Sequence, residues 1–237
     1  MESLFGFNIE KYPFELFSFS HFLMIVILLI MAVLMYVFRQ SFKEKKTVKY
    51  ILIAVLITSA VSYQLWFLLN GQWDIKINLP LQLCSISLYL CTFMLLSKSY
   101  RLFEITFFVS MSGAFLAIVT PELFFGFPHF RFFQFFIAHM VIVLSCLYML
   151  WVEEFRPTFM SVIRSFIVLN VIAVFVFIIN KLIGSNYMFL VEKPSNTSII
   201  DYLGPYPWYI LSLEAVAFAL FILIYLVIYL LRKNKRG

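Results

Sequence analysis

The sequence predicts an all-α, polytopic membrane protein, a bundle of seven transmembrane helices with the N-terminus outside and the C-terminus in the cytoplasm. Of its 237 residues, 63% are hydrophobic and only 13% are charged, and the mean hydropathy is +0.97. Soluble domains have about 45–50% apolar and about 25% charged residues. The composition therefore excludes an ordinary soluble globule and a long disordered tail.

Seven apolar stretches are long enough to cross a bilayer core, which takes roughly 20 helical residues for about 30 Å. Backbone polar groups find no water in hydrocarbon, so these stretches must be helical. We expect one integral membrane domain over residues 1–237, without internal repeats. The predicted spans are 17–38, 48–70, 79–97, 101–120, 132–152, 162–182 and 207–231.

Basic and turn-forming residues mark the ends of the spans. The residues before span one have no basic n-region and no small-residue cleavage site, so we expect no cleaved signal peptide. A basic run from Arg39 to Lys49 separates spans one and two. Span three is predicted to open at Leu79-Pro80, because proline is tolerated in the first turn of a helix. The longest loop, 183–206, contains glycine and proline and precedes span seven.

The distribution of Lys and Arg predicts the topology. Thirteen of the 18 lie after spans one, three and five or in the C-terminal tail, and five lie on the other side. The positive-inside rule then places the C-terminus inside and the N-terminus outside, in a multi-pass protein of the plasma membrane. Three tryptophans, Trp66, Trp73 and Trp208, are expected at the outer interface, and Trp151 at the inner one.

The charged and cysteine residues restrict the classes of partner. The net charge of +6 resides in membrane-flanking loops, so we expect contact with membrane lipids and no nucleic-acid binding. The three cysteines have neither CxxC spacing nor His neighbours at metal-ligand spacing. A disulfide scaffold and a zinc site are thus excluded, and we expect no metal and no cofactor. No sequence feature indicates a particular protein partner.

Polar side chains inside the spans gather at one depth, in the outer third of the bundle. With a rise of 1.5 Å per residue, Cys84 lies roughly 8 Å below the outer end of span three, and His139 and Glu214 lie roughly 10 Å down spans five and seven. His21 and Gln64 also lie in this outer third. Polar groups are costly inside a membrane, so each is a candidate functional residue.

These residue types suggest nucleophilic catalysis. Cys84 could act as nucleophile, His139 as its general base, and Glu214 as the group that orients the imidazole. The structural alternatives are a packing cysteine, a histidine in a helix–helix hydrogen bond, and a carboxyl that is protonated or paired. Spacing gives a shared depth and leaves both interpretations open.

Other polar residues in the spans are predicted to be structural. We expect His21 to be structural or to contact a lid, and Glu104 to pair with Arg101 one turn earlier. Cys91 and Cys146 are expected in the core.

Three segments carry a resemblance to a known family: LPLQLCSI from Leu79, NYMFL from Asn186 with the following EKP, and GPYPWY from Gly204. Together they resemble the YwaF-type family of bacterial integral membrane proteins over nearly the whole chain. That family is similar, more remotely, to animal transmembrane acyltransferases, which move fatty acyl chains between phospholipids with a membrane Cys and a His.

The resemblance implies roles for individual residues. Cys84, the Cys of the LPLxLC segment, and His139, after the aromatic stretch of span five, match the catalytic pair. Many relatives have His where this chain has Gln82, and Gln82 could orient a carbonyl or donate to an oxyanion. Cys84 and His139, together with Glu214 at the same depth, form the expected catalytic group. The expected substrate-binding residues are Gln82, Ser85, Gln64, Asn186, Tyr187 and Trp208.

Three functions remain open from the sequence. The leading hypothesis is a thiol-dependent acyltransferase that moves acyl chains between membrane lipids from the outer side. A proton-coupled transporter or permease would also place Glu214 and His139 inside the bundle. A non-catalytic structural or assembly protein would use the same polar residues only to join helices.

Overall fold

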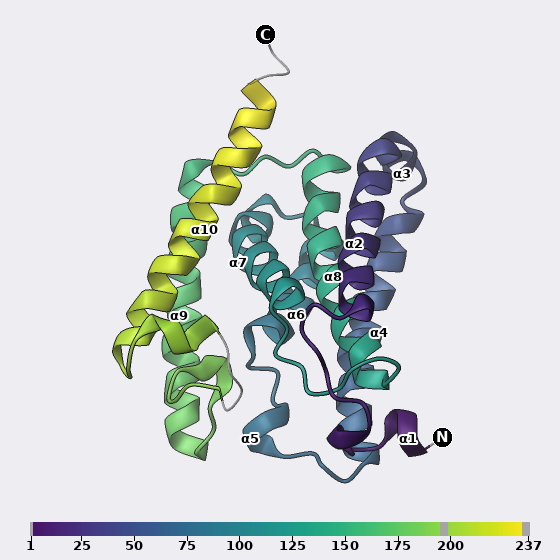
Figure 1. Ribbon diagram of the computed structural model, residues 1–237. Coiled ribbons are helices and arrows are strands. Elements are labelled where there is room, and N and C mark those ends of the chain that lie inside the picture. Colours follow the sequence, from purple (N-terminus) through teal and green to yellow (C-terminus); the bar gives the residue numbers. More distant parts are fainter. Residues whose placement is uncertain (1, 195–198, 234–237) are drawn as a thin grey trace.

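The structure, a computed structural model, describes residues 2–194 and 199–233. Within these ranges the chain is helical, with two isolated bridge residues and no strand. Figure 1 shows α2, α4 and α8 on one side of the bundle and α9 and α10 on the other, with α6 and α7 between them. The helices are α1 Glu2–Phe5, α2 Phe19–Val37, α3 Arg39–Lys45, α4 Thr47–Leu69, α5 Ile75–Asn78, α6 Leu83–Ser97, α7 Tyr100–Val119, α8 Phe130–Trp151, α9 Phe159–Ile183 and α10 Trp208–Lys233.

Six of the described helices are long and apolar enough to cross a membrane: α2, α4, α7, α8, α9 and α10. Their positions agree with six of the predicted spans to within a few residues. The remaining span, 79–97, is shorter than expected. Helix α6 begins only at Leu83 and has 15 residues, which is about 22 Å at the usual helical rise. Leu79-Pro80 is therefore not its first turn, and the chain is irregular from Leu79 to Gln82.

Local sequence explains where several helices begin and end. Ser18, Ser99 and Thr158 precede α2, α7 and α9, and each side-chain oxygen accepts a hydrogen bond from a backbone N–H of the first turn. Gly184 ends α9 in the left-handed conformation with φ 66°. His129 caps α8, because its Nδ1 accepts a hydrogen bond from the backbone N–H of Arg131.

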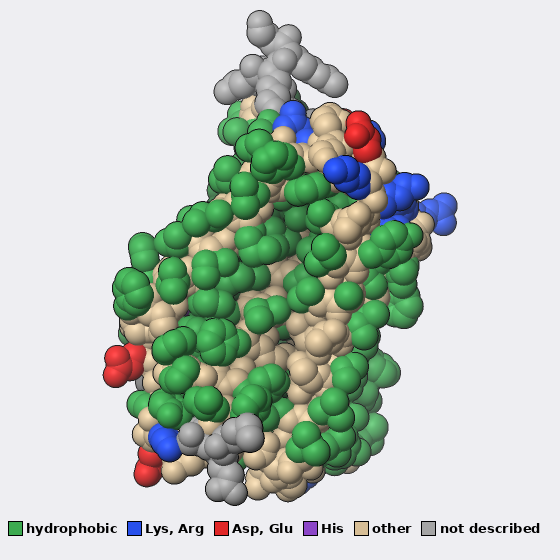
Figure 2. All heavy atoms as spheres, turned by 90° about the vertical axis from the view of Figure 1, so that its right-hand side faces the viewer, with side chains coloured by type: hydrophobic (Ala, Val, Ile, Leu, Met, Phe, Trp, Pro, Cys, Tyr) green, Lys and Arg blue, Asp and Glu red, His purple; other side chains and the backbone are tan. Residues whose placement is uncertain are grey.

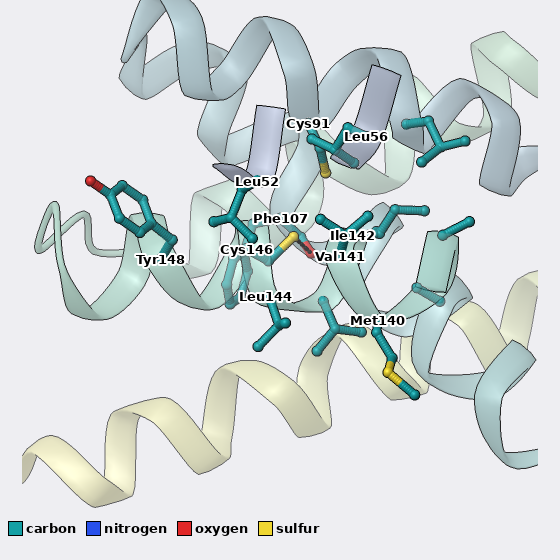
Figure 3. Close-up of a cluster of buried hydrophobic side chains, with 14 of the residues drawn as sticks. Leu52, Leu56, Cys91, Phe107, Met140, Val141, Ile142, Leu144, Cys146 and Tyr148 are labelled. Carbon is teal, nitrogen blue, oxygen red and sulfur yellow. Dashed lines mark hydrogen bonds between the residues drawn. The ribbon is translucent and has the colours of Figure 1, made fainter. Parts of the chain in front are cut away.

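Helix α8 is the centre of the bundle. In its most apolar window 78% of the residues are buried, compared with 6% for α10. Figure 3 shows the packed cluster that α8 forms with α6, α4 and α7. Cys91 and Cys146 are fully buried in this cluster, so the prediction that both belong to the core is confirmed.

The outer surface is apolar, as a helix bundle in lipid requires. Figure 2 shows one face covered by hydrophobic side chains, with Lys and Arg gathered mainly near the end where Figure 1 places α3. Large side chains on α2, α9 and α10 are more than half exposed, among them Leu29, Val171 and Leu223. The chain is thus a multi-pass membrane protein that contacts lipids.

Two ion pairs connect neighbouring segments at the α3 end of the bundle. Lys43 pairs with Glu154 at 2.5 Å, and Lys98 pairs with Glu153 at 2.6 Å. Both pairs join loops that the sequence analysis placed on the cytoplasmic side. Of the basic C-terminal tail in that analysis, residues 234–237 lie outside the described residues.

Two sequence expectations for structural residues need correction. Glu104 is structural, but its partner is Arg164 at 2.7 Å on α9, with Ser161 donating a second bond at 2.6 Å. Arg101 forms no ion pair with this carboxylate, which faces α9. Trp66 is only 4% exposed, so its ring packs inside the bundle and does not face lipid. Its indole N–H donates to the carbonyl of Phe5, which lies beyond the end of α4 in the N-terminal segment.

The N-terminal segment folds back onto the end of the bundle opposite α3, here called the α5 end (Figure 1). Its backbone bonds to the loop between α7 and α8, with Phe14 N–H donating to Phe124 and Gly126 N–H donating to Tyr12. Gly126 has no room for a side chain, since a Cβ there would lie 2.5 Å from the carbonyl oxygen of Pro13. The segment therefore closes part of the α5 end.

Candidate functional site

A cavity of about 1210 Å³ opens within the bundle toward the α5 end. Residues of α4, α6, α7, α8, α9 and α10 line it, together with the loop after α9. Its walls are mainly apolar, and a smaller set of polar groups projects into it. Pockets for small molecules usually measure about 300–1,000 Å³, so this cavity is large enough for a ligand with a long apolar chain.

The structure brings Cys84, His139 and Glu214 to this one cavity from three different helices. Cys84 lies on α6, His139 on α8 and Glu214 on α10. Of the six residues expected to bind substrate, Gln64, Gln82, Ser85 and Asn186 also line it. The shared depth inferred from helical rise thus corresponds to a shared cavity.

Cys84 lies in the first turn of α6, where the shortened helix exposes its N-terminus to the cavity. Gln82 is the N-cap residue but makes no side-chain cap. No described group accepts from the backbone N–H groups of Leu83, Cys84 or Ser85. Free N–H groups and the helix dipole favour negative charge at this position. Such a position suits the oxyanion of a tetrahedral intermediate.

His139 is 7% exposed and is oriented by its own helix. Its Nδ1 lies 2.7 Å from the carbonyl oxygen of Phe135, one turn earlier. Because a carbonyl oxygen only accepts, Nδ1 carries the proton, and the neutral ring has its lone pair on Nε2. No described residue bonds to Nε2. The tautomer is the one that a general base needs, and the backbone of α8 selects it.

The sequence predicts that Glu214 orients the imidazole of His139. In the structure the backbone carbonyl of Phe135, and not Glu214, bonds to Nδ1 of His139. Glu214 is half-buried on α10 and lines the cavity. No described side chain forms an ion pair with its carboxyl group. A carboxyl inside a membrane bundle needs a polar ligand or water as its partner.

Gln82 and Gln64 fix the loops at the α5 end. The Gln82 side-chain oxygen accepts from the backbone N–H of Met188 at 3.0 Å. Gln64 donates to the carbonyl of Asn78 at 2.7 Å, and its oxygen accepts from the indole of Trp73 at 2.9 Å. The amides of both residues therefore position the loops that surround the cavity.

Asn186 and Tyr187 hold the loop after α9. The Asn186 amide bonds to the backbone of Val191 and Glu192. Tyr187 is buried, does not line the cavity, and its hydroxyl donates to Ile75 at 2.6 Å. Burial raises the pKa of Tyr187 to about 12, so the hydroxyl stays neutral. Trp208 is 63% exposed and lies outside the cavity lining.

His21 is a structural residue, which confirms one of the two predicted roles. It is fully buried, its Nδ1 accepts from the backbone N–H of Phe17 at 3.0 Å, and its Nε2 lies 2.8 Å from the carbonyl of Ile118. Both ring nitrogens are satisfied, and the ring joins the start of α2 to the end of α7.

Sequence reasoning missed several polar residues of the cavity, above all Arg131 and Gln134 on α8. Arg131 was counted only as a topology signal. Helical spacing could have found it, because residues 131, 134, 135, 138, 139 and 142 all line the cavity and recur at three or four residues. Asn170 on α9 also lines it. Among the residues described, no three His, Cys, Asp or Glu side chains form a metal-binding cluster.

The fold and the cavity together define a polytopic membrane protein with a thiol, an imidazole and a carboxyl in one intramembrane chamber. Comparison with protein families makes the assignment more specific: the model of the TMEM164 family matches residues 16–225. The chain therefore belongs to the TMEM164 family. The curated proteins and the solved structures give no match.

Proposed function

We propose that this protein is a thiol-dependent acyltransferase that moves fatty acyl chains between membrane lipids. The observation that carries the proposal is that Cys84 and His139 line the same large, mainly apolar cavity. The similarity to transmembrane acyltransferases stated in the sequence analysis supports it. The cavity supplies the apolar volume that an acyl chain needs.

The first half of the reaction forms a thioester. Nε2 of His139 takes the proton of Cys84, and the thiolate attacks the ester carbonyl carbon of the donor lipid. The free N–H groups at the start of α6 stabilise the oxyanion. The ester C–O bond then breaks, and the leaving lyso-lipid oxygen takes the proton from His139.

The second half returns the acyl chain to an acceptor. The hydroxyl of a lyso-lipid gives its proton to Nε2 and attacks the thioester carbonyl. The C–S bond breaks, and Cys84 regains its proton from His139.

We further propose that α6 is a seventh crossing, completed by the irregular stretch 79–82. The basic loops around α3, α6–α7 and α8–α9 share one end, which supports a cytoplasmic α3 end and an N-terminus outside. The cavity then opens toward the outer side. The plasma membrane is the proposed location.

Acyl exchange in defined lipid tests the proposal. The purified protein is placed in nanodiscs with a phospholipid that carries an isotopically labelled acyl chain and with an unlabelled lyso-phospholipid. We expect label in the acceptor, and its loss in Cys84→Ala and in His139→Ala. Cys91→Ala, the same substitution further along α6, is the control and should remain active. Full activity in Cys84→Ala or His139→Ala contradicts the mechanism.

A proton-coupled transporter is the second candidate, favoured by the Glu214 carboxyl in the cavity, which forms no ion pair with a described side chain. It predicts a substrate-dependent proton flux in proteoliposomes that survives Cys84→Ala and stops in Glu214→Gln. A purely structural protein would show neither flux nor transfer, and its Cys84 would be no more reactive than Cys91.

A further inference from the structure

Arg131 brings into the cavity a positive charge that forms no ion pair with a described carboxylate. It lies in the first turn of α8 and is half-buried. The ion pairs among the described residues use Lys43, Lys98 and Arg164 instead. Taking a cation out of water is costly unless an opposite charge compensates it. The site therefore favours an anionic ligand.

Neutral groups hold the Arg131 guanidinium in place. Its Nη1 donates to the side-chain oxygen of Gln134, and the Gln134 amide donates in turn to the carbonyl of Ser59 at 3.0 Å. The guanidinium carbon lies 4.6 Å from the ring centroid of Tyr63 and 5.7 Å from that of Trp66. These contacts orient the guanidinium without cancelling its charge. Its remaining N–H groups have no acceptor among the described residues.

The position of Arg131 relative to His139 suits a particular class of anion. Both residues line the cavity from α8, and His139 follows Arg131 by eight positions, which is about 12 Å along the helix axis. In a glycerophospholipid only the glycerol backbone separates the phosphate from the acyl ester. A phosphate at Arg131 would therefore direct the ester inward, toward His139 and Cys84.

We propose that Arg131, positioned by Gln134 and Tyr63, binds the phosphate of a glycerophospholipid whose acyl chain fills the apolar part of the cavity. Guanidinium groups bind phosphate oxygens through two parallel N–H donors, a geometry that a lysine cannot reproduce. The inference rests on the proposed acyl transfer and names the head-group chemistry of its lipid. Arg131 is a binding residue in this scheme and takes no part in proton transfer.

Photo-crosslinking measures lipid binding in the absence of acyl transfer. The protein carries Cys84→Ala, so that nothing turns over, and is placed in nanodiscs. Two probes share the same diazirine-bearing acyl chains: a phosphatidylcholine and a diacylglycerol, which lacks the phosphate. We expect the phosphatidylcholine to label peptides of the cavity. Arg131→Gln should lower this labelling about tenfold or more, as expected for the loss of charge-assisted hydrogen bonds. Labelling by the diacylglycerol should not change.

Three comparisons make the result specific. Arg131→Lys should keep part of the labelling, which separates loss of binding from loss of folding. Lys76→Gln removes another cation of the cavity lining and should have little effect. Arg101→Gln, an exposed arginine in the first turn of α7, controls for the change of net charge.

Several outcomes would overturn the inference. Equal capture of the two probes, or capture that ignores Arg131→Gln, excludes a phosphate site at Arg131. Displacement of the phosphatidylcholine probe by millimolar inorganic phosphate would show that the site takes free phosphate rather than a lipid. Because Cys84 is absent from this assay, Arg131-dependent capture would stand even if acyl exchange failed, and that failure would contradict the proposed function alone.

Discussion

The side-chain oxygen of Gln82 accepts a hydrogen bond from the backbone N–H of Met188, 3.0 Å away. This bond joins the residue before α6 to the loop that follows α9. Cys84 lies only two residues after Gln82, and both line the cavity, as Met188 does. One amide thus couples the position of the candidate nucleophile to the position of the covering loop.

Gln82→Ala should loosen that loop. The Met188 N–H loses its hydrogen-bond partner, which should lower the local stability of the loop by about 1 kcal/mol. Amide hydrogen exchange over 187–191 should then be severalfold faster. Gln72→Ala, an exposed glutamine in the turn after α4, should leave this exchange unchanged. Unchanged exchange in Gln82→Ala would show that the bond does not restrain the loop.

Tyr187→Phe should destabilise the protein at the α5 end. The Tyr187 hydroxyl donates to Ile75 and also accepts from the backbone N–H of Leu79 at 2.8 Å. Removing the hydroxyl leaves two backbone groups unpaired, which should lower the free energy of unfolding by about 1–3 kcal/mol. Thermal unfolding in detergent measures the change. Tyr202→Phe, at a side chain that is 86% exposed, should have no effect, and equal melting temperatures for the two variants would contradict the prediction.

Glu104→Ala tests the corrected partner of this buried carboxylate. It breaks the buried hydrogen bond to Ser161 and the ion pair with Arg164, so we expect a loss of about 1–3 kcal/mol in unfolding free energy. Arg164→Ala should show part of this loss, and Arg101→Ala should stay within about 0.5 kcal/mol of the native protein. The opposite order for the two arginines would restore the pairing expected from sequence.

Glu122 should make stability depend on pH. It lies in the loop after α7, and burial of its partly exposed carboxyl group raises its pKa from 4.5 to about 7. Between these values the folded state binds more protons than the unfolded state. Stability should therefore fall as the pH rises from about 4.5 to about 7 and then level off.

Melting temperatures at pH 5 and pH 8 check this sign. The fall should be smaller in Glu122→Gln, which cannot lose a proton there. Glu10→Gln, at an exposed carboxyl in the N-terminal segment, serves as the matched control. A native protein that is more stable at pH 8 than at pH 5, with no difference from Glu122→Gln, would refute the assignment.

Hydropathy predicted most of the fold, because each long helix must bury its backbone in hydrocarbon. It failed at Leu79–Gln82, which is apolar enough for a helix. The chain is irregular there, and its neighbouring polar groups find partners in Tyr187, Gln64 and Met188. Those partners are remote in sequence and leave no local periodic signal.

The sequence predicted the depth at which the candidate site residues lie, but not which residues their side chains contact. Helical rise placed Cys84, His139 and Glu214 at one level, and the three line one cavity. Rise alone gives no rotation between helices, so it could not show that Phe135 orients His139 or that Glu104 faces Arg164. Arg131 was missed because a cation near the end of a span is ordinarily a topology signal.

The most direct test of the account is to trap the acyl-enzyme. The protein in nanodiscs is incubated with a labelled phospholipid and no acceptor, quenched in acid and digested, and its peptides are analysed by mass spectrometry. The account predicts a labelled acyl chain on Cys84 that hydroxylamine releases, absent in His139→Ala and not found on Cys91 or Cys146. An acyl chain on no cysteine, together with acyl exchange that persists in Cys84→Ala, would contradict the central claim.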